Sequence, residues 1–329
     1  MTNRHDHRLI DGRAVQARIL TELRAELERE RAIRPVGRLL SVSIGPSPEI
    51  EVYVRNQARG AERVGLPFER QLWPADITQE ECKRRIAALN DDAEVLGIIL
   101  QRPVPAHIHV RSLQSAIHPL KDVEGMNPAS IGNIVYNDVA LAPCTAAAAV
   151  ELVRETGLNL RGLEVVMIGH SEIVGKPAAF LLMAEGATVT VCHHMTRSVA
   201  MHSRRADVVV VAVGKPHLIG PDMIKPGAAV IDIGINQVSA PDGTLRILGD
   251  VDTDRVREVA GWITPVPGQE HGFSLGELAE MTPAQKRAAV APKYRHPENP
   301  EISWSGRGRK PGWIVEALEA GKSLEDFAI

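Results

Sequence analysis

The chain has 329 residues, of which 44% are hydrophobic and 24% are charged, and its net charge is −3. This composition is ordinary for a globular protein, and the length suggests two domains and a fraction of a third. The charge excludes a polycation as a whole, and no stretch approaches the 18 apolar residues of a membrane-spanning helix. The three cysteines form no CxxC pair and the first residues carry no apolar signal segment. We therefore expect a cytoplasmic location and no membrane partner.

Helical and strand patterns alternate through the first half of the chain. Apolar residues recur at helical spacing within residues 8–31, and Leu39–Ile44 is an apolar run that ends at a glycine and two prolines. The elements expected next are helices at 53–64 and 78–90 and a strand at 95–100. This alternation predicts an α/β domain with a mainly parallel sheet, which we place at residues 1–145.

A second α/β unit begins near residue 146. Its expected elements are a strand at 163–169, a helix at 177–186, and strands at 188–192, 207–213 and 228–233. This order predicts a doubly wound, Rossmann-like domain that binds a nucleotide, with limits at residues 146–270. The pattern stops beyond Pro267, and residues 271–290 are predicted to be a linker.

A glycine-containing loop joins the first strand of this second unit to its helix. Glycines at 169 and 175 would let the backbone approach a pyrophosphate, and Pro177 suits a first helical turn. The spacing is Gly-x-Ser-x-x-x-Gly, with Ser171 in place of the usual second glycine. The residues alone leave two alternatives open, which are a dinucleotide site and a tight structural turn.

The residues after the next strand bear on the choice of cofactor. No acid follows Thr188–Cys192, so the carboxylate that would bind the ribose of NAD is missing. His170 and His194 could contact a 2′-phosphate, which favours NADP over NAD. The alternative is that both are ordinary surface histidines.

Many short motifs of the chain, in order, resemble those of the methylenetetrahydrofolate dehydrogenase/cyclohydrolase (FolD) family. The resemblance covers about residues 8–268. The motifs are Ile10-Asp-Gly12, Tyr53-Val54, Gln101-Arg-Pro-Val-Pro105, Lys121-Asp-Val-Glu-Gly125, Pro143-Cys-Thr145, Gly169–Pro177, Ala212-Val-Gly-Lys-Pro216, Ile231-Asp-Ile-Gly-Ile-Asn236, Gly249-Asp-Val251 and Thr264-Pro-Val-Pro-Gly268. The resemblance implies oxidation of 5,10-methylenetetrahydrofolate to the methenyl form with NAD(P), followed by hydrolysis to 10-formyltetrahydrofolate, in a homodimer.

Site residues follow from the same resemblance, position by position. The expected catalytic residues are Tyr53, Gln57, Gln101 and Glu124. The expected cofactor-binding residues are Gly169, His170, Ser171, Ile173, Gly175, Pro177, His194, Val213, Gly214 and Ile235. No metal is expected.

The chain departs from the family pattern in its folate-binding half. The lysine that assists hydrolysis in the family is replaced by Gln57, whose amide cannot titrate, while the nearby glutamine that tunes this lysine in the family remains as Gln101. The family's aspartate is Glu124, its serine before the tyrosine is Ile50, and its leucine after Gln101 is Arg102. The usual Gly-Gly-Val-Gly-Pro-Met-Thr after Thr-Pro-Val-Pro is also missing. We expect the cyclohydrolase step to be lost or very weak and the dehydrogenase to use NADP, with NAD as the alternative.

The end of the chain is basic, with seven Lys or Arg against two acids between residues 286 and 310. The segments Ala291-Pro-Lys-Tyr-Arg-His-Pro297, Trp304-Ser-Gly-Arg-Gly-Arg-Lys-Pro311 and Gly321-Lys-Ser-Leu-Glu-Asp-Phe327 resemble the DNA-binding module of the histone-like nucleoid-structuring (H-NS) proteins. The resemblance spans about residues 271–329 and is strongest from residue 291 onward. An extended Arg-Gly-Arg can enter the narrow minor groove of A·T-rich DNA. The expected DNA-binding residues are Lys293, Arg295, Arg307, Gly308, Arg309 and Lys310.

Three hypotheses remain open from the sequence. The first is an NADP-dependent methylenetetrahydrofolate dehydrogenase with an added DNA-binding module. The second is a non-catalytic or sensing FolD-like protein that acts on DNA in the nucleoid. The third is an accidental fusion whose junction lies near Gln269.

Overall fold

The computed structural model of the chain describes residues 9–239, 245–266, 294–295 and 303–304. The chain separates into two compact units, Met1–Ser274 and Leu275–Ile329. No helix among the described residues is long and apolar enough to cross a membrane. The predicted linker at 271–290 and most of the predicted DNA-binding module lie outside the described residues.

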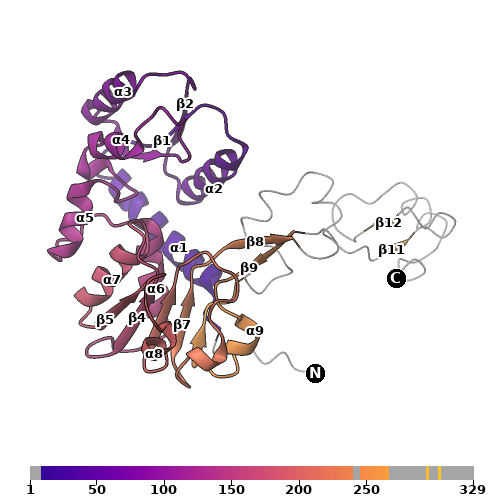
Figure 1. The fold of residues 1–329 in the computed structure, drawn as a ribbon. Helices are drawn as coiled ribbons and strands as arrows, with labels where there is room; N and C mark the ends of the chain where they lie inside the picture. Colours follow the sequence, from indigo (N-terminus) through magenta and orange to yellow (C-terminus); the bar gives the residue numbers. More distant parts are fainter. Residues whose placement is uncertain (1–8, 240–244, 267–293, 296–302, 305–329) are drawn as a thin grey trace. The chain divides into compact units, whose positions relative to one another are not determined.

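A three-stranded parallel sheet forms the centre of the first part of the chain, in the order β2-β1-β3. Its strands are β1 (Arg38–Ile44), β2 (Phe68–Trp73) and β3 (Val95–Leu100). The helices that follow or flank them are α1 (Gly12–Arg31), α2 (Pro48–Val64), α3 (Gln79–Asp91), α4 (Val110–Ala116) and α5 (Pro128–Val135). In Figure 1, α3 and α4 lie together on one side of the strands and α2 lies on the other. The predicted α/β domain with a parallel sheet is confirmed.

Local sequence accounts for the ends of these helices. The Thr78 hydroxyl accepts a hydrogen bond from the backbone N–H of Glu81 and so caps α3. Helix α2 ends at Gly65, whose φ of 80° is the left-handed conformation that suits glycine. The prediction for this helix began too late, at Tyr53, because α2 starts at Pro48. Proline is favourable there, since the first turn of a helix leaves its N–H groups unbonded.

A five-stranded parallel sheet follows, in the order β10-β7-β6-β4-β5. Its strands are β4 (Glu164–Ile168), β5 (Thr188–Cys192), β6 (Val208–Val211), β7 (Ala229–Asp232) and β10 (Trp262–Ile263). The helices are α6 (Cys144–Arg154), α7 (Gly175–Ala184), α8 (Val199–Ser203) and α9 (Thr253–Val256). Strand β4 pairs with β5 on one side and with β6 on the other, so the chain reverses its winding direction there. The predicted doubly wound domain is confirmed.

Both faces of this sheet are buried, which explains its nearly continuous apolar strands. Val165 and Met167 of β4 point into a core shared with α6 and α7, whereas Val166 and Ile168 point into a second core on the opposite face. The alternation follows from the two-residue period of a strand. The reversal beside β4 opens a crevice at the carboxyl ends of the strands, where doubly wound domains bind their ligands.

Two antiparallel pairs complete the described structure. Strands β8 (Asn236–Ser239) and β9 (Leu245–Leu248) pair within the first unit. In the second unit, β11 (Tyr294–Arg295) pairs with β12 (Ser303–Trp304). The sequence patterns had predicted none of these four strands, because strands of two to four residues carry little periodicity. Strand β2 was also missed.

Candidate active site and cofactor crevice

Gln57 and Gln101 form a hydrogen-bonded pair, as the family pattern led us to expect. The Gln101 Nε2 donates to Gln57 Oε1 over 2.7 Å and to Ser41 Oγ over 3.0 Å. Gln101 is buried at the end of β3, so this pair is fixed from the side of the sheet. The oxygen of Gln57 therefore accepts one hydrogen bond from within the protein, and its own Nε2 remains as a donor. Because a neutral amide does not titrate, this side chain offers no base to a water molecule.

Tyr53 stands one helical turn before Gln57 on α2, and residues four apart share a face of a helix. Its side chain is 65% exposed, which leaves the ring free to stack on a planar ligand. Ile50, at the position of the family serine, is 2% exposed and belongs to the core. That position therefore contributes packing rather than a hydrogen bond to a ligand.

Glu124 lies beside the end of β3, where its Oε2 accepts a hydrogen bond from the backbone N–H of Leu100 over 3.2 Å. Burial raises the pKa of this carboxyl to about 7, against the opposing attraction of Arg102. Near neutral pH the group therefore divides between carboxylic acid and carboxylate. In the acid form it can donate a hydrogen bond, and in the ionised form it accepts only.

The loop between β4 and α7 is held by its own serine. The Ser171 hydroxyl accepts from the backbone N–H groups of Val174 and Gly175, over 3.1 and 3.3 Å. A Cβ at Gly175 would lie 2.2 Å from the carbonyl oxygen of Gly169. One at Gly169, where φ is 123°, would lie 2.3 Å from that of Ala212. Both glycines thus allow the close backbone packing of a tight turn, and that packing is also compatible with the cofactor loop that the sequence left as the alternative.

The predicted cofactor residues are divided between two cavities. Gly169, His170, Ser171, His194 and Val213 line a cavity of about 450 Å³ at the carboxyl ends of β4, β5 and β6. We call this cavity the crevice pocket.

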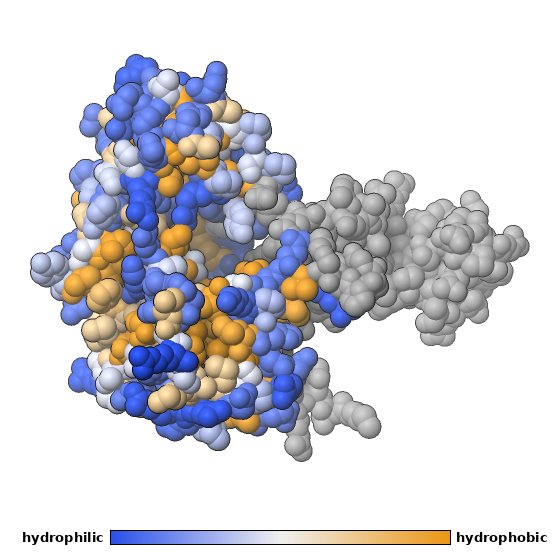
Figure 2. All heavy atoms as spheres, in the orientation of Figure 1, coloured by the Kyte–Doolittle hydropathy of each residue, from blue (hydrophilic) through white to orange (hydrophobic). Residues whose placement is uncertain are grey.

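Ile173 and Pro177 line the other cavity, of about 550 Å³, with Arg102, Met126 and residues of α4 and α5. Figure 2 shows apolar residues over the part of the surface that carries α5 and α7 in Figure 1. The remaining three predicted residues line neither cavity: Gly214 and Ile235 are exposed, and Gly175 is buried in the first turn of α7.

Asp250 holds the turn that follows β6, and the sequence reasoning did not single it out as a site residue. Its Oδ2 accepts from the N–H groups of Val213 and Gly214 over 2.6 and 3.0 Å, and its Oδ1 accepts from that of Lys215 over 2.7 Å. Asn236 Nδ2 adds a fourth bond, over 2.8 Å, to Oδ1. Asp250 is fully buried. It therefore fixes one wall of the crevice pocket through the backbone.

His193 and Lys215 also line the crevice pocket, and both were missed. A signal for His193 existed in the sequence, because it is adjacent to the predicted His194. The predicted DNA-binding residues lie outside the described residues, apart from Arg295, whose backbone belongs to β11.

Comparisons with known proteins agree with this geometry. The profile of the tetrahydrofolate dehydrogenase/cyclohydrolase catalytic domain matches residues 10–124, and that of the family's NAD(P)-binding domain matches residues 143–277. The bifunctional protein FolD of Rhodobacter capsulatus is 82% identical over 291 residues, which cover 88% of this chain and 97% of that protein. The chain belongs to the tetrahydrofolate dehydrogenase/cyclohydrolase family.

Solved structures of this family have the same fold. The FolD enzyme of Campylobacter jejuni has a TM-score of 0.74 at 33% identity, and the match covers 85% of this chain and 98% of that one. The Trypanosoma brucei enzyme, solved with NADP and an inhibitor, has a TM-score of 0.73 at 38% identity, covering 82% and 92%. The profile of the H-NS histone C-terminal domain matches residues 289–329. Both resemblances identified in the sequence are thus confirmed.

Proposed function

We propose that the protein oxidises 5,10-methylenetetrahydrofolate to 5,10-methenyltetrahydrofolate with NADP as the hydride acceptor. The proposal rests on family membership together with a crevice pocket at the carboxyl ends of β4, β5 and β6, where doubly wound domains hold a dinucleotide. NADP is favoured over NAD because the pocket contains three imidazoles and Lys215, which are suited to a phosphate, and its lining includes no carboxylate for a ribose.

The residues of the crevice pocket fit such a cofactor. The loop of Gly169 and Ser171 leads into the start of α7, where the helix dipole favours an anion. The wall formed by Val213 and Lys215 is fixed by the buried carboxylate of Asp250. The bound cofactor supplies the hydride acceptor, and the protein positions its partner.

The folate is proposed to lie against the residues around the ends of α2 and β3. Tyr53 offers an exposed ring for stacking on the planar parts of the substrate. Glu124 offers a half-ionised carboxyl for its polar edge. Gln57 and Gln101 form a hydrogen-bonded pair beside this place, and the free amide donor of Gln57 can orient the substrate.

The cyclohydrolase step is proposed to be absent. Oxidation removes a hydride from the one-carbon unit, so the protein has no proton to take up. Hydrolysis adds water to that carbon and must release a proton, which a general base accepts in an efficient reaction. At the position of the family lysine this chain has Gln57, which is neutral and whose oxygen accepts a hydrogen bond from Gln101. The two steps of the family reaction are therefore separable in this chain.

The function is tested with the full-length protein, methylenetetrahydrofolate and either NADP or NAD. We expect NADPH to form, with a higher kcat/KM for NADP than for NAD. We also expect methenyltetrahydrofolate to accumulate, because the enzyme forms it faster than it hydrolyses spontaneously. Absorbance at the wavelengths of NADPH and of the methenyl product follows both. A stoichiometric yield of 10-formyltetrahydrofolate at the enzymatic rate would contradict the loss of the cyclohydrolase, and no NADPH at all would contradict the dehydrogenase.

A second function is proposed for the end of the chain, which is binding to A·T-rich DNA. The match to the H-NS C-terminal domain and the Arg307-Gly308-Arg309 sequence support it. Lys293, Arg295 and Lys310 are proposed to contact phosphates. A homodimer, as the family resemblance implies, would present two such modules and raise the avidity.

DNA binding is tested by fluorescence anisotropy with A·T-rich and G·C-rich duplexes at several salt concentrations. We expect the Arg307→Ala/Arg309→Ala double variant to lose at least about tenfold in affinity for the A·T-rich duplex. The matched control is Arg24→Ala/Arg29→Ala, which removes the same charge from the exposed face of α1. An equal loss in both variants would show attraction by net charge alone.

The domain limits follow as proposals: residues 1–145 for the folate-binding domain, 146–270 for the cofactor-binding domain, 271–290 for the linker and 291–329 for the DNA-binding module. The non-catalytic DNA-binding protein and the accidental fusion are the competing hypotheses. A rise in melting temperature on adding NADP separates the fusion from the others, because a folded cofactor site is stabilised by its ligand. A location in the cytoplasm and nucleoid stays a prediction.

A further inference from the structure

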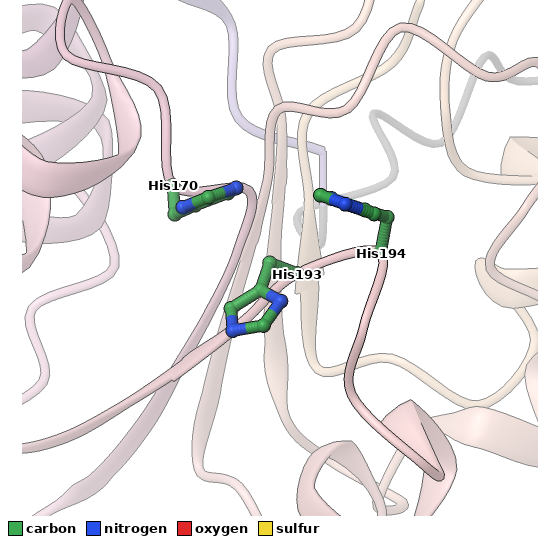
Figure 3. Close-up of side chains that lie close together, drawn as sticks. All are labelled: His170, His193 and His194. Atoms are coloured by element: carbon green, nitrogen blue, oxygen red, sulfur yellow. The ribbon is translucent and has the colours of Figure 1, made fainter.

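Three histidines gather at the carboxyl ends of two neighbouring strands. His170 follows β4, and His193 and His194 follow β5, which pairs with β4 in parallel register. One ring nitrogen from each lies within 4.8 Å of those of the other two. Figure 3 shows His170 and His194 directed toward each other, with His193 beside the space between them. Ring centroids are 4.7 to 5.9 Å apart and the rings are tilted by 39 to 57°, so the cluster is not a stack.

We propose that His170, His193 and His194 form a binding site for a divalent transition-metal ion of the zinc, nickel or copper class. Neutral imidazole is the characteristic ligand of these ions, and three protein ligands leave an open position for water or a ligand oxygen. In a tetrahedral site with metal–nitrogen bonds of about 2.1 Å, ligand nitrogens are about 3.4 Å apart. The observed spread is larger by little more than 1 Å. Two of the rings are exposed and the third is half-buried, so rotation of the side chains can close that gap.

The three ligands are not equivalent. The Nδ1 of His193 accepts a hydrogen bond from the backbone N–H of Met195 over 3.1 Å, so its neutral ring carries the proton on Nε2. A metal ion can bind His193 only after this ring gives up a proton or the Met195 bond. Within the described residues, the ring nitrogens of His170 and His194 make no hydrogen bond, so a metal ion can bind them without breaking one. His170 and His194 are therefore the principal ligands and His193 the weaker one.

Metal and dinucleotide compete for the same space. All three histidines line the crevice pocket, together with Gly169 and Lys215. An ion held between the strand ends places its charge and its water where the adenosine end of the dinucleotide would lie. The inference that the ion excludes the dinucleotide rests on the proposed cofactor site, whereas the inference that the ion binds does not. Micromolar zinc would then inhibit the enzyme by raising the apparent KM for NADP rather than by lowering kcat.

The test uses the full-length protein, treated with chelator and titrated with Co²⁺, whose absorption bands report the ligands and geometry, followed by displacement with Zn²⁺. The matched variants are His170→Ala, His193→Ala and His194→Ala, and the control is His202→Gln on α8, outside the cluster. We expect the tightest site to weaken at least about tenfold in the His170 and His194 variants, less in the His193 variant, and not in the control. Unchanged titrations in the His170 and His194 variants would overturn the proposal.

A second titration separates exclusion from failure of the cofactor site. NADP binding is measured by calorimetry with and without one equivalent of Zn²⁺. We expect the apparent Kd for NADP to rise with zinc in the natural protein and to be insensitive to zinc in the His194 variant. NADP binding that zinc leaves unchanged, at full metal occupancy, would overturn the exclusion. If NADP does not bind even without zinc, the proposed cofactor site fails while the metal titration stands. If the histidine variants weaken NADP and no metal binds, the cluster serves a phosphate and the metal site is refuted.

Discussion

Replacing Gln57 by lysine is expected to give the protein a cyclohydrolase activity, with formation of 10-formyltetrahydrofolate raised by about 10²- to 10⁴-fold. Gln101 is buried behind residue 57 and now donates to its oxygen. With a lysine present, rotation of the Gln101 amide would turn its oxygen toward the Nζ atom. A lysine in this half-buried place would have a lowered pKa, which suits a proton acceptor near neutral pH. The measurement is the decay of methenyltetrahydrofolate absorbance on adding enzyme.

The matched control is Gln57→Met, which keeps the length of the side chain and removes both its donor and its acceptor. We expect this variant to form NADPH and to leave the methenyl product intact. If the Gln57→Lys variant forms NADPH but still fails to hydrolyse the methenyl product, Gln57 is not the reason why the cyclohydrolase activity is absent. Glu124, Arg102 and Ile50 would then be the remaining departures from the family pattern in the described part of this pocket.

The adjacency of Gln57 and Gln101 shows what could be predicted from the sequence. The two positions were paired only through a resemblance, because 44 residues separate them and no local pattern joins α2 to the end of β3. The strands at 95–100 and 188–192 were predicted to the residue, since the first is an almost entirely apolar run and the second is rich in β-branched residues, and both patterns are distinctive. Strand β2 was missed because its charged and polar residues follow the edge of a sheet rather than its buried centre.

The histidine cluster and the hydrogen bonds of Asp250 to the turn after β6 could not be predicted for a different reason. His170 and His193 are brought together by the pairing of β4 with β5, and periodicity predicts strands but not which strands are neighbours. Asp250 bonds to backbone groups about 36 residues earlier, and those groups are the same in any sequence. Side chains whose partners are backbone atoms leave no complementary residue that a motif search could find.

Removing the Asp250 carboxylate is expected to cause the largest loss of stability and of cofactor affinity. In Asp250→Ala, the N–H groups of Val213, Gly214 and Lys215 lose the buried carboxylate that accepts from them. Gly214 and Lys215 are exposed, so water can replace part of this bonding, and the free energy of unfolding should fall by about 1 to 3 kcal/mol. The crevice pocket would lose its fixed wall at the same time, so the Kd for NADP should rise.

Asp250→Asn separates the two carboxylate oxygens. Its remaining oxygen can still accept from Val213 and Gly214, while its new amide nitrogen would face two other donors, the Lys215 N–H and Asn236 Nδ2. We expect a loss between those of the natural protein and the alanine variant, in urea unfolding and in NADP titration alike. Because Asp250 does not line the crevice pocket, its effect on NADP must pass through the backbone of Val213–Lys215. An alanine variant that unfolds more easily yet binds NADP with unchanged affinity would contradict this. Asp250 would then stabilise the fold, but the pocket wall would keep its position without the carboxylate.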